Sequence, residues 1–123
     1  MIKETGLRLS FLSNMTPEML ISCSRNAGID KYFEQFISTD TIQTYKPGTL
    51  AYKLGVDKLN LKKEEILFGA FGGWDASGSK WFGYPTFWVN RAKAPLEQLD
   101  ATPDAVGDTL IELANYAKNL INR

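Results

Sequence analysis

Short apolar runs alternate with stretches of helical periodicity along the chain. Four runs predict strands, at Leu7–Leu12, Phe36–Ser38, Ile66–Ala70 and Thr86–Val89. The third run has no polar interruption, and it lies between a pair of glutamates and a pair of glycines. This pattern is typical of a strand that is buried on both faces of a sheet.

Helices are predicted between these strands and after the last one. Thr16–Glu18 is typical of a helix start, with a capping hydroxyl, a proline at the first position and an early acid, and Gly28 ends this helix. A second helix opens at Pro47–Gly48, and a third follows Trp74–Asp75. The final helix has the clearest apolar stripe, made by Val106, Leu110, Leu113, Ala114, Ala117 and Ile121.

Strands separated by helices predict an α/β fold, with a parallel sheet and right-handed crossovers. The sequence shows no repeat and no linker, so residues 1–123 are expected to form a single domain. Ligands of such sheets bind beyond the carboxyl ends of the strands. The segments at that edge are Ser13–Asn14, Thr39–Asp40, Phe71–Asp75 and Asn90–Arg91.

The amino-acid composition excludes several classes of binding and catalysis. Lysine and arginine together number 14, as do aspartate and glutamate, so the net charge is zero and no basic surface for nucleic acid is expected. The chain has no histidine and one cysteine, which excludes histidine-based catalysis, histidine metal ligands and an internal disulfide. Without an apolar run of membrane-spanning length, we expect a cytoplasmic protein with no membrane partner.

Two candidate sites fall near the predicted ligand edge. Ser13 and Asn14 end the first strand just before a helix start, where hydroxyl and amide groups could bind an anion. In the structural alternative, Asn14 orders the turn into the helix. Lys46 precedes a proline, which favours an extended backbone and could aim its ammonium group. The alternative for Lys46 is a solvated surface lysine.

Asp75 and Tyr52 are further candidates. Asp75 lies in the glycine-rich segment Phe71–Gly78, where it could act in a site or cap the following helix. Tyr52 lies six residues after Lys46, and a tyrosine in that setting usually belongs to the core or its boundary.

Taken together and in this order, the segments resemble the haloacid dehalogenase superfamily, and most closely its type II 2-haloacid dehalogenase branch. The resemblance rests on SNMTPEML, TYKP with the following Tyr52, the block from Ile66 to Arg91, and PLEQL, and it spans about residues 5 to 115. It implies a Rossmann-like three-layer core with a parallel sheet.

The resemblance also implies a reaction and its residues. In this family an aspartate attacks the carbon that bears the halogen, and water hydrolyses the resulting ester. Ser13 and Asn14 would bind the substrate carboxylate, and Tyr52 would contribute to the site. Lys46 would keep the nucleophilic carboxylate charged, and Asp75 would orient Lys46. No cofactor and no metal are implied, and a small carboxylate or other anion is the expected ligand.

The sequence departs from the family pattern in three respects. It contains no D-x-Y-G-T segment, which carries the family's nucleophile, so it corresponds to the carboxyl-terminal half of such an enzyme without the central first strand, the nucleophile and the cap domain. Ala70 and Gly72 stand where the dehalogenases have serine and asparagine. Phe71 stands where related phosphatases have a second acid for Mg²⁺, so a metal-dependent phosphatase is not expected.

The absent central strand would leave the strands that end at Ser13 and Ala70 with open edges. We therefore expect these strands to pair directly, or another chain to supply the missing strand, as in a homodimer or a complementing chain. Three functions stay open: part of a hydrolase that is inactive alone, a non-catalytic interaction module, and an anion site at Ser13, Asn14 and Lys46 that serves as a sensor or as half of a two-chain enzyme.

Overall fold

A computed structural model describes residues 6–95 and 101–121 of the chain. The chain divides into two compact units, Lys3–Asn60 and Leu61–Arg123, which are called here the amino-terminal and carboxyl-terminal units. The expectation of one domain over the whole chain stays a prediction. Of the segment PLEQL, only Pro95 lies within the described residues.

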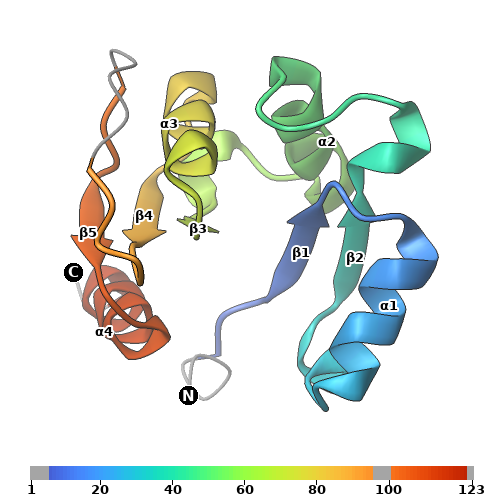
Figure 1. Cartoon of the computed structure of the whole chain (residues 1–123), viewed down its shortest axis with the longest axis horizontal. Coiled ribbons are helices and arrows are strands. Elements are labelled where there is room, and N and C mark those ends of the chain that lie inside the picture. The colour runs from blue at the N-terminus through green and yellow to red at the C-terminus, as the bar shows by residue number, and fades with distance from the viewer. Residues whose placement is uncertain (1–5, 96–100, 122–123) are drawn as a thin grey trace. The chain divides into compact units, whose positions relative to one another are not determined.

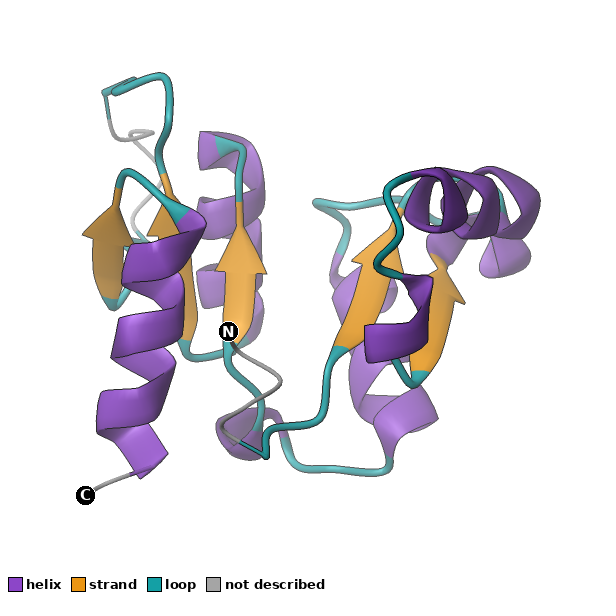
Figure 2. Ribbon diagram, turned by 90° about the horizontal axis from the view of Figure 1, so that it is seen from below, coloured by secondary structure: helices purple, strands orange, loops and turns teal. Residues whose placement is uncertain are grey.

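The amino-terminal unit contains a two-stranded parallel sheet. β1 (Ser10–Ser13) pairs with β2 (Gln35–Ser38), and the register sets Ser13 opposite Ser38. Both strands therefore end at the same level, and their arrows run side by side in Figure 2. This alignment brings the segments that follow the two strands to one edge of the sheet, as the sequence predicted.

Two helices pack against this sheet, and the sequence signals for their ends are confirmed. α1 (Pro17–Asn26) is capped by the Thr16 hydroxyl, which accepts a hydrogen bond from the Met19 N–H at 3.3 Å. Gly28 follows the helix with a φ of +71°, a conformation that glycine adopts at little cost. α2 (Thr49–Leu59) begins after Gly48. None of the described helices is long and apolar enough to cross a membrane.

The carboxyl-terminal unit contains a three-stranded parallel sheet in the order β3-β4-β5. β3 spans Phe68–Ala70, β4 spans Thr86–Val89 and β5 spans Ala105–Gly107. All four side chains of the central strand β4 are buried. α3 (Gly73–Phe82) and α4 (Leu110–Ile121) complete the unit (Figure 1).

The alternation of side chains along β4 explains how the sheet is covered on both faces. The Thr86 hydroxyl meets Ser79 of α3, whereas the ring of Phe87 packs against Tyr116 of α4 with 5.3 Å between ring centroids. Successive residues of a strand point to opposite faces, so the two helices cover opposite faces of β4. Leu113 of α4 packs directly against Gly69 of β3. A Cβ atom at residue 69 would lie only 2.9 Å from the leucine side chain, so the close packing requires glycine there.

β5 corrects the expectation for the end of the chain. The sequence pattern assigned Val106 to the apolar stripe of the final helix, but Val106 lies in β5 opposite Trp88. The helix begins at Leu110, where the Thr109 hydroxyl accepts a hydrogen bond from the Glu112 N–H. A strand of three residues is too short to show its own periodicity, so it merged with the helical pattern.

Direct pairing of the strands that end at Ser13 and Ala70 stays a prediction, because β1 and β3 belong to different units. Across the described ranges, β1 has β2 as its strand partner and β3 has β4, in two separate sheets. The strand arrangement is the parallel α/β fold that the sequence predicted. The alternative, in which another chain supplies a strand, stays a prediction.

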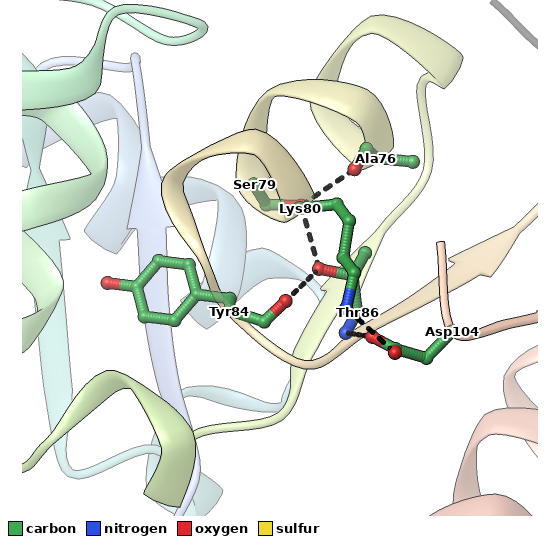
Figure 3. Close-up of polar contacts among 6 residues, drawn as sticks. All are labelled: Ala76, Ser79, Lys80, Tyr84, Thr86 and Asp104. Carbon is green, nitrogen blue, oxygen red and sulfur yellow. Dashed lines mark hydrogen bonds and ion pairs between the residues drawn. The ribbon is translucent and has the colours of Figure 1, made fainter. Parts of the chain in front are cut away.

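A polar network joins β4, β5 and α3 in the carboxyl-terminal unit (Figure 3). The Asp104 carboxylate accepts hydrogen bonds from the Thr86 N–H at 2.7 Å and from Lys80 Nζ at 2.8 Å. The Ser79 hydroxyl, which is fully buried, lies 3.1 Å from the Thr86 hydroxyl and donates to the Ala76 carbonyl. Partial burial opposes ionisation of Asp104, but the hydrogen bonds from Lys80 and Thr86 outweigh it and hold the Asp104 pKa below its usual value.

Removing the Asp104 carboxylate is expected to destabilise the protein. Asp104→Ala should lower the free energy of unfolding by about 1–2 kcal/mol, because it removes a half-exposed ion pair and leaves the Thr86 N–H without its acceptor. Asp57→Ala is the matched control, since it breaks only an exposed ion pair with Lys53 and should cost about 0.5 kcal/mol or less.

The same variant carries a pH dependence that urea unfolding at several pH values can measure. A carboxylate with a lowered folded-state pKa stabilises the protein above its unfolded pKa of about 4, and this contribution fades as the pH falls through the folded pKa. The difference between wild type and Asp104→Ala should therefore shrink from pH 7 to pH 3. A difference that grows on acidification would contradict this assignment.

Candidate functional site

The carboxyl ends of β1 and β2 form the candidate site of the amino-terminal unit. The Ser13 hydroxyl accepts a hydrogen bond from the Met15 N–H at 3.1 Å, which turns the chain toward α1. The Ser38 hydroxyl donates to the Met15 carbonyl, so the two strand ends are joined directly. The turn after β1 is thus held from both strands, and Asn14 lies within it.

The side chain of Asn14 is bound to the main chain of Lys46. Its Oδ1 accepts a hydrogen bond from the Lys46 N–H at 2.9 Å, and its Nδ2 donates to the Lys46 carbonyl at 3.2 Å. These two bonds join residues that are 32 positions apart in the sequence. The structure therefore brings together Ser13, Asn14 and Lys46, which the sequence predicted as one site.

The alternative role for Asn14, ordering the turn into the helix, is filled mainly by other side chains. The turn into α1 is ordered by the hydroxyls of Ser13 and Thr16, which accept from nearby N–H groups. Asn14 instead fixes the loop that carries Lys46. A carboxamide that pairs with both polar atoms of one residue holds that residue much as a neighbouring strand would.

Thr39 is the residue of this site to which the sequence gave no role. It follows β2 directly, it is fully buried, and its hydroxyl donates to Asn14 Oδ1 at 2.8 Å. The sequence had placed Thr39 at the ligand edge, and its position directly after a predicted strand was the available signal. What the sequence could not show is that its hydroxyl reaches Asn14, because that contact depends on the strand register.

Lys46 and Tyr52 lie on either side of the start of α2. Lys46 is half-buried, and its peptide bond with Pro47 is cis. The tight loop before the helix is closed by the Gly48 N–H, which donates to the Tyr45 carbonyl at 2.8 Å. Tyr52 is fully buried in α2, in agreement with its interpretation as a core tyrosine.

Tyr45 and Asp40 form a second, exposed interaction beside Lys46. The Tyr45 hydroxyl donates a short hydrogen bond to Asp40 Oδ1, and Gln43 Nε2 lies within 3.3 Å of the same oxygen. The hydrogen bond to Asp40 raises the pKa of Tyr45, with smaller contributions in the same direction from desolvation and from the negative charge of Asp40. The loop before Lys46 is thereby tied back to the segment after β2.

Asp75 is the candidate of the carboxyl-terminal unit. It is buried in the first turn of α3, where the helix dipole favours a carboxylate. Gly72 occupies the N-cap position of α3 and Asp75 is the third helical residue, so Asp75 is not the N-cap residue. Asp75 and Lys46 belong to different units, and the structure describes their surroundings separately.

Aromatic side chains surround the segment between β3 and α3. Phe71 and Trp74 are about half exposed, and the Phe71 carbonyl accepts a hydrogen bond from Trp88 Nε1 at 3.1 Å. The Arg91 guanidinium lies over the Phe71 ring, 5.7 Å from its centroid. Asn90, also from the predicted ligand edge, holds the turn after β4 through two hydrogen bonds with Ala94.

Within residues 6–95 and 101–121, no three histidine, cysteine, aspartate or glutamate side chains gather in a group that could hold a metal ion.

Comparison with known families gives a match over most of the chain. A family model described as haloacid dehalogenase-like hydrolase matches residues 1–80. Haloacetate dehalogenase H-2 of Moraxella sp. strain B is 38% identical over 115 residues, which cover 91% of this chain and 51% of that protein. The chain spans about half the length of the relatives it matches.

Solved structures agree with this match. The crystal structure of an L-2-haloacid dehalogenase has a TM-score of 0.92 and 37% identity, and the alignment covers 95% of this chain and 52% of that one. The L-2-haloacid dehalogenase from Xanthobacter autotrophicus with covalently bound chloropropionic acid has a TM-score of 0.89 and 28% identity, with coverage of 97% and 58%.

The Tyr45–Asp40 interaction can be tested by titration. Following the Tyr45 ring by NMR as the pH rises, we expect the wild-type phenol to ionise above the ordinary tyrosine value of about 10. Asp40→Asn should lower this pKa toward the ordinary value, because the charged acceptor is lost. Thr41→Val, at the position next to Asp40, should leave it unchanged. Identical titrations in wild type and Asp40→Asn would contradict the proposed cause.

Proposed function

The chain belongs to the haloacid dehalogenase-like hydrolase family, and we propose that it supplies the substrate-binding and charge-balancing side chains of a hydrolase acting on small 2-haloacids. The observation that carries this proposal is the binding of the Lys46 main chain by the Asn14 carboxamide beside Ser13. It brings the main chain of Lys46 beside Ser13 and Asn14 at one edge of a parallel sheet. The names of the relatives support the substrate class.

The proposed reaction has two steps. An aspartate oxygen attacks the carbon that bears the halogen, the carbon–halogen bond breaks, and halide leaves. Water then attacks the carbonyl carbon of the ester, which releases a 2-hydroxy acid and regenerates the carboxylate. The ammonium group of Lys46 favours the charged form of the aspartate and balances negative charge as it moves in each step.

Substrate binding is assigned to the edge formed by Ser13 and Lys46. A 2-haloacid carries a carboxylate, which needs hydrogen-bond donors and positive charge. The Ser13 hydroxyl can donate while it accepts from the Met15 N–H, and the start of α1 adds the favourable end of a helix dipole. We assign Asp75 and Tyr52 the roles that the family resemblance gives them, in orienting Lys46 and in completing the site.

The 123 residues are proposed to be inactive by themselves. Their sequence contains no D-x-Y-G-T segment, so the ester cannot form on the family's nucleophile. Ala70 and Gly72 also lack the polar side chains that place the hydrolytic water in the dehalogenases, by the resemblance given above. A nucleophile supplied from outside these residues would complete the first step.

Halide release tests the proposal directly. The chain should release no chloride from 2-chloropropionate, and mass spectrometry should show no covalent adduct. It should nevertheless bind 2-chloropropionate, as detected by NMR chemical shift changes at Ser13 and Lys46. Lys46→Ala should weaken this binding by about tenfold or more, because a charged donor is lost.

Lys58→Ala provides the control for binding, since it removes one positive charge from the exposed end of α2. It should leave the affinity within about twofold, because an exposed charge remote from the ligand is screened. Chloride release above the Lys46→Ala background would contradict the assignment of inactivity. Equal loss of binding in both lysine variants would contradict the role of Lys46.

A second proposal, an interaction module or half of a two-chain hydrolase, is favoured by the open strand edges. Within the sheet of its own described unit, β1 is paired along one edge only, and the same holds for β3. Edges of this kind expose N–H and C=O groups that can pair with a further strand. The proposed occupant is a strand from a second copy of the chain or from a complementing polypeptide.

Sedimentation velocity over a range of concentrations tests this second proposal. Self-association through a strand edge should persist at high salt, since main-chain hydrogen bonds and apolar contacts carry it. A monomer at all concentrations would contradict the homodimer and leave the complementing chain as the occupant to be tested.

A further inference from the structure

The carboxamide of Asn14 uses most of its hydrogen-bonding capacity on the protein itself. Its Oδ1 accepts from the Lys46 N–H at 2.9 Å and from the Thr39 hydroxyl at 2.8 Å, and its Nδ2 donates to the Lys46 carbonyl at 3.2 Å. A carboxamide oxygen has two lone pairs, and the nitrogen has two hydrogens. Both acceptor positions are therefore occupied, and one Nδ2 hydrogen remains for a ligand.

We infer that Asn14 acts mainly as a positioning residue for Lys46, and that Thr39 is a further positioning residue that acts through Asn14. This inference rests on the proposed function, since the position of Lys46 matters to the reaction only if Lys46 acts in it. It changes the role first expected for Asn14, which was direct binding of the substrate carboxylate. Ser13 and Lys46 then supply most of the contact with substrate.

The burial and chemistry of Thr39 support its assignment. The residue is fully buried, so its hydroxyl needs a protein partner. Oδ1 has only lone pairs to offer, so the threonine hydroxyl donates to it. If the carboxamide were turned over, its Nδ2 hydrogens would face the Lys46 N–H and the Thr39 hydroxyl, and the Lys46 contact would set donor against donor. The Lys46 N–H therefore fixes which way round the carboxamide lies, and the Thr39 hydroxyl adds a second hydrogen bond that holds Oδ1 in place.

Anchoring the main chain matters for a lysine because its side chain is long and flexible. Four rotatable bonds separate the Lys46 backbone from its ammonium group, so any movement of the loop is added to the spread of that charge. Catalytic groups are effective only when their supporting contacts keep them within a few tenths of an ångström. Asn14 and Thr39 tie this loop to the ends of β1 and β2, which are rigidly paired.

Amide hydrogen exchange at Lys46, measured by NMR, tests the inference without any ligand. Thr39→Val keeps the shape of the side chain but removes the hydroxyl, and it should make the Lys46 amide exchange about 3- to 10-fold faster. Thr39→Ser, which keeps the hydroxyl, should restore the exchange to within about twofold of wild type. The matched control is Thr41→Val. It lies in the same short 3-10 helix as Thr39, Thr39–Ile42, and it removes a hydrogen bond to the Ser38 carbonyl without touching Asn14.

Leu12 in β1 serves as the internal reference for overall stability. The inference is supported if Thr39→Val increases the exchange rate, relative to wild type, more at Lys46 than at Leu12. Thr41→Val should show no such difference. An equal increase at Lys46 and Leu12 means that Thr39 acts on stability alone, and overturns it. Unchanged exchange at Lys46 in Thr39→Val overturns it as well.

Asn14→Asp provides a second variant in case Thr39→Val does not fold. It keeps the shape of the side chain and the acceptor for the Lys46 N–H, but it sets an oxygen against the Lys46 carbonyl. Relative to wild type, the exchange rate should again increase more at Lys46 than at Leu12. Equal Lys46 exchange rates in wild type and variant would overturn the role of Asn14.

Binding of 2-chloropropionate separates failure of this inference from failure of the proposed function. If the wild-type chain binds the probe, Thr39→Val should weaken binding about 3- to 10-fold and Thr39→Ser should restore it. If the wild-type chain does not bind the probe, the proposed function fails, and the exchange at Lys46 still decides whether Thr39 and Asn14 position the loop. Unchanged affinity in Thr39→Val, with wild-type binding intact, overturns the inference.

Discussion

Two hydrogen bonds from the Asn14 carboxamide to the main chain of Lys46 organise the amino-terminal unit around its candidate site. The segment with Lys46 has neither a strand nor a long helix of its own before α2, and this side chain joins it to the end of β1. Thr39 fixes the carboxamide in turn, from the end of β2. The site is therefore a consequence of the parallel pairing of β1 with β2, which brings the two strand ends to one level.

In the carboxyl-terminal unit, a charged side chain holds a short strand in place beside its neighbour. β5 has only three residues, and a strand so short contributes few ladder hydrogen bonds. Asp104, just before it, binds the Thr86 N–H at the start of β4 and the ammonium group of Lys80 in α3 (Figure 3). These contacts hold the start of β5 beside β4, and α4 then covers the face of β4 that carries Phe87. The hydrogen bonds of the partly exposed Asp104 carboxylate therefore add to the few ladder hydrogen bonds that stabilise β5 against β4.

Membership of a family does not by itself give this chain the residues that perform the family's reaction. The fold and the order of the motifs agree with haloacid dehalogenase-like hydrolases over most of these residues. The residues that would perform the reaction are only partly present in the sequence, and the aromatic segment with Phe71 differs in polarity from the dehalogenase pattern. A chain can keep the scaffold of a family while its reaction depends on groups supplied from elsewhere, because fold and chemistry are carried by different residues.

The sequence by itself determined the parallel α/β class, the helix start at Thr16–Pro17 and the helix end near Gly28, because these features depend on local periodicity and on capping. Through its resemblance to the family, the sequence also predicted that Ser13, Asn14 and Lys46 form one site. Only the tertiary structure decided that Val106 lies in a strand and that Thr39 holds Asn14. Both depend on the register between segments distant in the sequence, which no local pattern records.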